Sequence, residues 1–188
     1  MPVQIGSVTH SFDEPTGLLS DCHRRVEMFI AALEQVADVS DRELTADTRR
    51  SLDLALRYFR EAAPKHTADE EISLFPRLRG ISDEELQSAL ARLDELESDH
   101  RWAEPLHATA ERLGTKCLQE RQLSTGDAKE FRGAVHRLHE MYRRHIEVED
   151  REVFPVAKKL LSEQAKSEIA NEMKERRGLN AIATVQLK

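Results

Sequence analysis

One stretch of the sequence occurs twice, and it constrains the fold and the chemistry more than any other feature. The first copy, residues 66–76, reads HTADEEISLFP, and the second, residues 145–155, reads HIEVEDREVFP. Both copies contain His-x-x-x-Glu followed by an acidic residue, and both end in Phe-Pro. On a helix, residues four positions apart lie roughly 6 Å apart on one face. Each copy therefore presents an imidazole beside a carboxylate.

The Phe-Pro pair at the end of each copy predicts a core anchor followed by a local irregularity in the helix, because proline has no backbone N–H to donate. A single copy of such a motif is more often a surface His–Glu pair on a charged helix. Two matched copies favour a different interpretation, in which the copies face each other and enclose metal.

The composition predicts one all-α domain that spans residues 1–188. Charged residues make up 34% and hydrophobic residues 39%, with only 7 Gly and 6 Pro. A chain rich in Glu, Leu, Arg and Ala is typical of helical proteins. Val and Ile are too sparse and scattered for a sheet.

The charge pattern and the ends of the sequence restrict the class of protein. The formal net charge is −7 without a basic stripe, so we expect neither nucleic acid nor a membrane surface as a partner. No apolar run approaches the ~20 residues that cross a bilayer. The first residues also lack the basic segment and the apolar segment of a secretory signal. Cys22 and Cys117 have no close spacing, so no disulfide is indicated. We therefore expect a cytoplasmic protein.

Apolar periodicity predicts four long helices and a shorter fifth one. The expected ranges are 14–37, 45–78 with an interruption at Pro64, 82–113, 127–161 and 163–176. Gly80 and Gly114 are expected to end the second and third helices, with Gly80 in the left-handed conformation. Short connections between long helices predict an antiparallel up-down-up-down four-helix bundle over about residues 14–161. The short C-terminal helix and a tail make up residues 162–188.

Each of the four long helices carries a histidine on its apolar face. Four such imidazoles, two of them with a glutamate one turn further on, are costly to bury unless something binds them. The candidate ligands are His23, His66, Glu70, His100, His145 and Glu149. Imidazole and carboxylate without thiolate suit iron, manganese or zinc, with iron favoured for open octahedral sites. The set is too large for a single zinc ion.

A ferritin-like di-iron bundle is the nearest alternative, and its signature is Glu-x-x-His on each of two helices. This chain has that spacing at Glu97–His100 and at Glu104–His107, but both fall on the same expected helix. The ferritin-like interpretation is therefore rejected.

The ordered pattern His, His-x-x-x-Glu, His, His-x-x-x-Glu, with Phe-Pro after each glutamate, resembles the hemerythrin family in its bacterial HHE cation-binding branch. The resemblance covers about residues 14–161. It implies two iron ions bridged by Glu70 and Glu149 and by an oxo or hydroxo group, with manganese or zinc as possible substitutes. The resemblance assigns the remaining coordination to four imidazoles, those of His23, His66, His100 and His145. A free position would then take dioxygen, nitric oxide or peroxide.

One position departs from the oxygen-carrying members of that family. They have a second histidine four residues after the one on the third helix, and this chain has Glu104 there. Glu104 is therefore included among the candidate metal ligands, and a kink at Pro105 decides whether it faces the metal. A carboxylate at this position favours ferric iron and disfavours reversible oxygen carriage. Tyr142, on the face of His145, is either a hydrogen-bond donor to bound ligand or a packing residue.

The expected function is that of a non-haem di-iron protein that binds or reacts with O2, NO or peroxide. Two alternatives use the same centre, namely storage or donation of iron and an enzyme that consumes peroxide or NO. The sequence leaves open whether the protein is an enzyme, and it predicts no separate catalytic residue. A monomer or a homodimer is expected.

Overall fold

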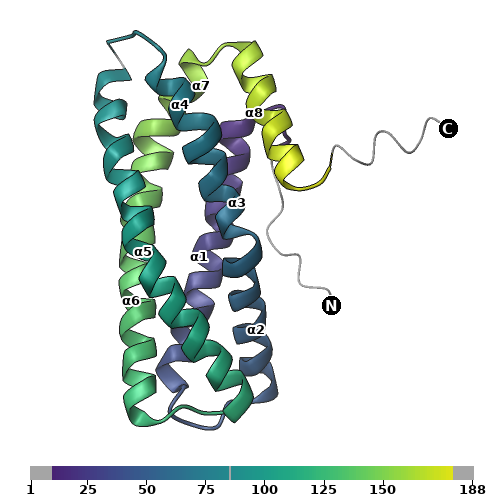
Figure 1. Ribbon diagram of the computed structural model, residues 1–188, viewed down its shortest axis with the longest axis vertical. Helices are drawn as coiled ribbons and strands as arrows, with labels where there is room; N and C mark the ends of the chain where they lie inside the picture. The colour runs from purple at the N-terminus through teal and green to yellow at the C-terminus, as the bar shows by residue number, and fades with distance from the viewer. Residues whose placement is uncertain (1–9, 85, 180–188) are drawn as a thin grey trace, which may run out of the picture. The chain divides into compact units, whose positions relative to one another are not determined.

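The computed structural model describes residues 10–84 and 86–179 (Figure 1). Every regular element within these residues is helical, which confirms the all-α prediction. The architecture is a helical bundle with a short additional helix at the C-terminal end. The part of the tail from residue 180 onward, which the sequence left without a helical pattern, lies outside the described residues.

The predicted helices appear with small changes of boundary. The elements are α1 (Pro15–Val39), α2 (Ala46–Glu61), α3 (Ala63–Ala68), the π-helix η1 (Asp69–Leu74), α4 (Phe75–Arg79), α5 (Leu86–Glu120), α6 (Thr125–Val148), the π-helix η2 (Glu149–Val153), α7 (Phe154–Leu160) and α8 (Glu163–Arg176). The expected helix over 45–78 is α2 followed by the continuous run α3–η1–α4. The expected helix over 127–161 is α6–η2–α7. None of the described helices is long and apolar enough to cross a bilayer.

Close contacts group the described residues into two compact units. The first unit comprises the described residues up to Arg24, those of Pro64–Glu97, and those from Glu147 onward. The second unit comprises Arg25–Ala63 and Ser98–Ile146. The assignment of the whole chain to one domain stays a prediction.

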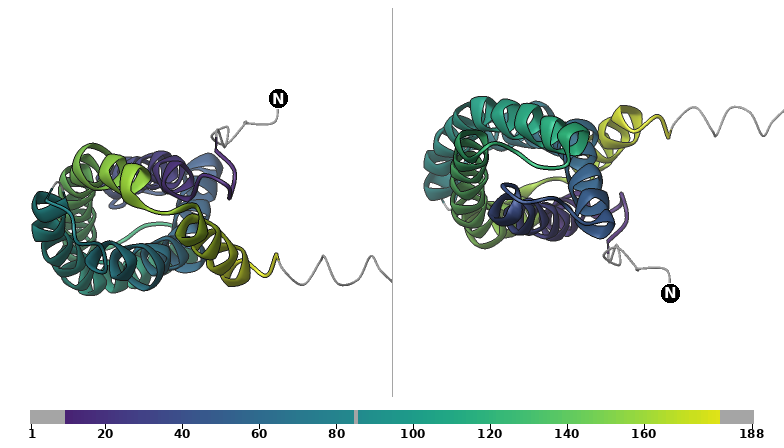
Figure 2. Two further views of the ribbon diagram at one scale, coloured as in Figure 1. Left: turned by 90° about the horizontal axis from the view of Figure 1, so that it is seen from above. Right: turned by 90° about the horizontal axis from the view of Figure 1, so that it is seen from below.

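In the second unit, parts of α1 and α5 pack with α2 and α6 around an apolar core. The ribbons of these helices can be followed in the right panel of Figure 2. Its fully buried side chains include Leu33, Leu52, Leu113, Phe131 and Leu138. The side chain of Thr45 caps α2 by accepting a hydrogen bond from the Thr48 N–H at 3.2 Å. This bond satisfies one of the N–H groups that a helix start leaves unpaired.

Two glycines that the sequence assigned to helix ends behave differently. Gly80 does end α4, but with a φ of −82° it is right-handed rather than left-handed. The prediction that Gly114 ends its helix is wrong, because α5 continues to Glu120. A Cβ on Gly114 would lie 2.9 Å from the side-chain carbons of Leu56 on α2. Gly114 therefore serves close packing between α2 and α5 rather than helix termination.

In the first unit, a second apolar core joins the start of α1 to α4, α5, α7 and α8, with Leu19, Phe75, Leu93, Phe154 and Ile169 among its members. Phe75 is 0% exposed and Phe154 is 4% exposed. Both phenylalanines of the repeated motif are thus core anchors, as the sequence predicted. Cys22 and Cys117 are buried and are not joined in a disulfide.

Replacing Gly114 by alanine should destabilise the protein. Alanine gains up to about 1 kcal/mol of helix propensity over glycine, but overpacking a well-packed core costs about 1–3 kcal/mol. We expect a net loss in the free energy of unfolding, measured by urea titration. Gly133 lies within α6 and nothing stands within 4 Å of a Cβ built on it. Gly133→Ala should therefore stabilise the protein, and equal stabilisation by Gly114→Ala would contradict the packing argument.

Candidate metal centre

Both copies of the repeated motif form a π-helix at the glutamate. η1 begins at Asp69, directly before Glu70, and η2 begins at Glu149. In each copy the phenylalanine N–H bonds to the carbonyl oxygen of the motif's own glutamate, five residues earlier. The proline that follows cannot donate a backbone hydrogen bond, and its ring would clash with the carbonyl four residues before it in a regular α-helix. The predicted irregularity is thus present in both copies, and π-helical turns are frequent at functional sites.

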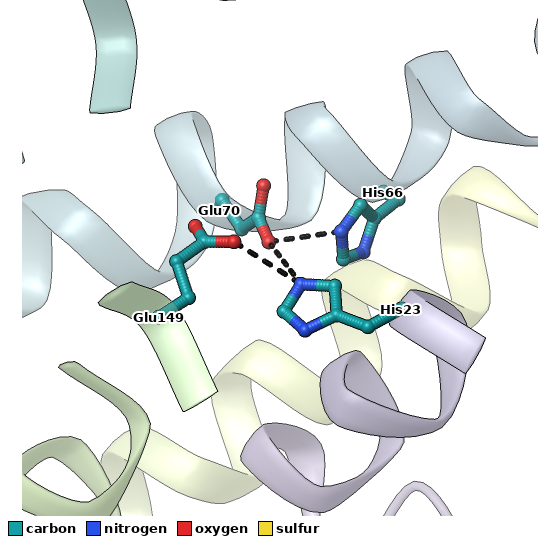
Figure 3. Close-up of side chains that lie close together, drawn as sticks. All are labelled: His23, His66, Glu70 and Glu149. Carbon is teal, nitrogen blue, oxygen red and sulfur yellow. Dashed lines mark ion pairs between the residues drawn. The ribbon is translucent and has the colours of Figure 1, made fainter. Parts of the chain in front are cut away.

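Four of the predicted ligands converge in the first unit, as Figure 3 shows. His23 Nε2 lies 3.1 Å from Glu149 Oε2 and 3.8 Å from Glu70 Oε1. His66 Nε2 lies 3.1 Å from Glu70 Oε1. One donor atom from each of the four residues lies within 4.8 Å of the others, and all four side chains are buried. They come from α1, α3, η1 and η2.

The electrostatics of this cluster favour a bound cation. Glu70 and Glu149 are both 0% exposed, and buried carboxylates are costly unless positive charge compensates them. Burial disfavours the charged imidazole of His23, but hydrogen bonds to Asp150, Glu149 and Glu70 outweigh it and raise the pKa of His23 well above its usual value. Two imidazole nitrogens and two carboxylates, without thiolate, form a donor set that suits a divalent transition metal.

Asp150 orients His23 from the side opposite the cluster. His23 Nδ1 donates to Asp150 Oδ1 at 2.9 Å, and Ser20 Oγ donates to the same oxygen at 2.8 Å. Arg24 also pairs with Asp150. This arrangement places the Nδ1 proton toward Asp150 and leaves Nε2 facing the two glutamates, as a carboxylate behind a metal-binding histidine commonly does.

Sequence reasoning gave Asp150 no role, although the acidic residue after each motif glutamate was noted as part of the repeat. That acidic residue was the available signal. The Phe154 ring stacks on the His23 imidazole with ring centroids 5.2 Å apart and adds a second constraint on its orientation.

In the second unit, the imidazoles of His100 and His145 lie side by side. Their Nε2 atoms lie 3.0 Å apart, and His145 is 3% exposed. His145 Nδ1 lies 3.5 Å from Asp99 Oδ2, and Arg144 donates to Asp99 Oδ1 at 2.9 Å. Burial would raise the pKa of Asp99, but His145 and Arg144 lower it below its usual value. Asp99 thus lies on the Nδ1 side of His145, as Asp150 lies on the Nδ1 side of His23.

Two other residues singled out from the sequence lie elsewhere in the second unit. Glu104 is exposed on α5, and that position lends no support to a ligand role. The Tyr142 hydroxyl lies 2.7 Å from His107 Nε2. Tyr142 also stacks with Phe59 at a centroid separation of 6.0 Å, so packing accounts for its place.

The helical fold and the buried histidine and glutamate side chains define a metal-binding helical protein. Comparison with known families agrees, since residues 14–157 match the hemerythrin HHE cation binding domain. The chain belongs to this family, and the resemblance inferred from the repeated motif is confirmed. This chain is also 28% identical to an uncharacterized protein of Haemophilus influenzae, over 89% of this chain and 92% of the relative. No solved structure matches the chain.

Removing the charge of Asp150 should weaken metal binding while leaving the fold in place. Asp150→Asn keeps an oxygen acceptor near His23 but loses the carboxylate that holds its tautomer. Loss of such a partner costs roughly 10–100-fold in metal affinity, which competition against a chelator would measure. Glu147 is exposed and pairs with Arg151 at 2.7 Å, so Glu147→Gln serves as the control. Equal affinities for the two variants would remove the orienting role of Asp150.

His107 should make the stability of the metal-free protein depend on pH. Burial lowers the pKa of His107 from 6.5 to about 4. Because the folded-state pKa lies below the unfolded one, the stabilisation is complete above pH 6.5 and is lost as the pH falls toward 4. The expected loss is at most about 3 kcal/mol of unfolding free energy. In urea titrations with chelator present, His107→Gln should show a shallower fall over this range, whereas parallel curves would contradict the assignment.

Proposed function

We propose that this protein holds two iron ions without haem and binds or reacts with a small oxidant or gas, namely O2, NO or peroxide. The observation that carries the proposal is the buried cluster of His23, His66, Glu70 and Glu149, in which two fully buried carboxylates lie beside two imidazoles. Membership of the hemerythrin HHE family supports it. Iron would supply the redox chemistry and the affinity for oxygen-like ligands.

The donor set supports two ions rather than one. The cluster in the first unit already provides four side chains, which is the usual number for a single tetrahedral metal site. His100 and His145 provide two further imidazoles, whose Nε2 atoms lie 3.0 Å apart. Carboxylates that bridge two metals are a common feature of two-metal sites in helical bundles, and the proposal gives Glu70 and Glu149 that role. Manganese and zinc suit the same donor atoms and are the competing ions.

The chain's own residues would set the conditions for the chemistry. Asp150 would hold the proton on Nδ1 of His23, so that the Nε2 lone pair of His23 remains available. Asp99 lies 3.5 Å from Nδ1 of His145. Complete burial of Glu70 and Glu149 excludes bulk water from the carboxylates. A low local dielectric strengthens the interaction of these charges with a bound cation.

The alternatives, storage or donation of iron and consumption of peroxide or NO, require the same residues and differ only in what happens after loading. One experiment on the iron-loaded protein therefore distinguishes both alternatives from the proposed function. A cytoplasmic location and a monomeric or homodimeric state stay predictions. Two buried cysteines that are not joined in a disulfide are compatible with a reducing compartment.

Anaerobic loading with ferrous iron tests the proposal. The protein should take up about two iron ions per chain and melt at a higher temperature, because the folded chain binds the metal and the unfolded chain binds it weakly. Glu70→Gln and Glu149→Gln should each lower the iron content, while the exposed Glu147→Gln should not. A content near one ion, unaffected by either glutamate, would contradict the two-metal proposal.

Separate additions of O2, peroxide and NO to the loaded protein then distinguish the functions. Binding or sensing predicts a stable change in the optical spectrum with one of the three ligands. An enzyme predicts turnover of peroxide or NO, and a store predicts oxidation followed by release of iron to a chelator. Absence of any spectral change with all three would contradict the proposed reactivity.

A further inference from the structure

The C-terminal helix α8 is attached to the first π-helix by a buried ion pair. Asp69, the first residue of η1, is 0% exposed. It accepts a hydrogen bond from Arg176 at 2.7 Å and two from Arg177, at 2.6 and 3.2 Å. Arg176 is the last residue of α8, and Arg177 follows it. Among the described residues, this buried carboxylate pairs with two arginines at the end of a helix that carries none of the candidate metal ligands.

Further polar contacts continue along the same two surfaces. Ser73 is 0% exposed and accepts from Arg176 at 2.6 Å, while its hydroxyl donates to Glu172. One turn further on, Arg77 donates to Glu172 at 2.7 Å and to Glu168 at 3.2 Å. Residues 69, 73 and 77 therefore face residues 168, 172 and 176, with an apolar seam of Ile169 and Met173 buried beside them. Helix α8 packs against η1, and its place in the fold can be found by its label in Figure 1.

The second π-helix is supported in another way. The residue before its glutamate is Val148, where the first copy has Asp69. Its polar support comes from Asp150, which contacts His23, Ser20 and Arg24, and from Glu152, which accepts from Arg92 at 3.0 Å. The two copies of the motif thus carry similar candidate ligands but are contacted by different neighbouring residues. In the first copy, these contacts come from α8.

We propose that Arg176 and Arg177 are positioning residues of the metal centre, which act by pairing with Asp69 to hold η1 in the shape that directs Glu70 toward the cluster. Asp69 directly precedes Glu70, and the π-helical hydrogen bond at the carbonyl of Glu70 lies within the segment that α8 covers. Loss of the guanidinium groups while α8 stays docked would leave Asp69 buried and unpaired, which is strongly unfavourable for a carboxylate, so η1 would shift to relieve it. Docking of α8 and metal binding at Glu70 therefore stabilise each other, as linkage requires. This inference rests on the proposed metal centre.

Metal affinity separates a positioning role from simple stabilisation of the fold. Arg177→Gln should weaken binding of ferrous iron roughly 10–100-fold and reduce the rise in melting temperature that iron produces. Lys166→Gln is the matched control, because Lys166 lies on α8, carries the same charge and, among the described residues, pairs with Glu163 of the same helix at 2.7 Å. It should leave affinity unchanged. If Arg177→Gln lowers the melting temperature of the metal-free and loaded forms equally, with unchanged affinity, α8 is only structural and the proposal is overturned.

Hydrogen exchange on the wild-type chain tests the coupling without relying on a variant that folds. The amides of α8 should exchange more slowly when iron is bound. In Asp69→Asn, which keeps the size of the side chain but removes its charge, that metal dependence should disappear, and Arg177→Lys should retain part of it. Equal exchange with and without iron in the wild type would overturn the proposal. A wild-type chain that binds no metal at all would overturn the proposed function itself, which distinguishes the two failures.

Discussion

The structure depends on how the negative charges of two fully buried glutamates are compensated. Glu70 and Glu149 are 0% exposed, and the imidazoles of His23 and His66 lie beside them. Protonation of His23, favoured by its neighbouring carboxylates, offsets part of the charge, and a metal ion would offset more of it. The contacts around the glutamates serve to hold the compensating groups in place. Asp150 orients His23, Phe154 stacks on it, and the π-helices direct the glutamates.

The repeated motif explains why the same irregularity occurs twice. In each copy the phenylalanine anchors the core, the proline prevents a regular α-helical turn, and the wider turn that results places its hydrogen bond on the carbonyl of the motif glutamate. The copies then differ in their outer contacts. The first is contacted by Arg176 and Arg177 at the end of α8, and the second by Asp150 and its partners. The duplicated motif is thus held by two unrelated sets of contacts.

A feature of this structure could be predicted from the sequence when the residues that cause it are close together in the chain. Helices and histidine faces could be predicted because periodicity is local, and α8 begins and ends at the predicted residues. Gly114 was misassigned because the reason for a glycine there is Leu56, a neighbour distant in sequence. The roles of Asp150 and Asp69 could not be derived either, since their partners lie on other helices. Glu104 followed the motif spacing, yet its side chain faces solvent.

Anomalous X-ray diffraction at the iron absorption edge, from crystals of the iron-loaded protein, is the most direct test of the central claim. The account predicts two anomalous peaks, with Glu70 and Glu149 each bonded to iron and with His23 and His66 bonded through Nε2. A single peak that contacts neither glutamate, or iron found only at exposed histidines such as His136, would contradict it.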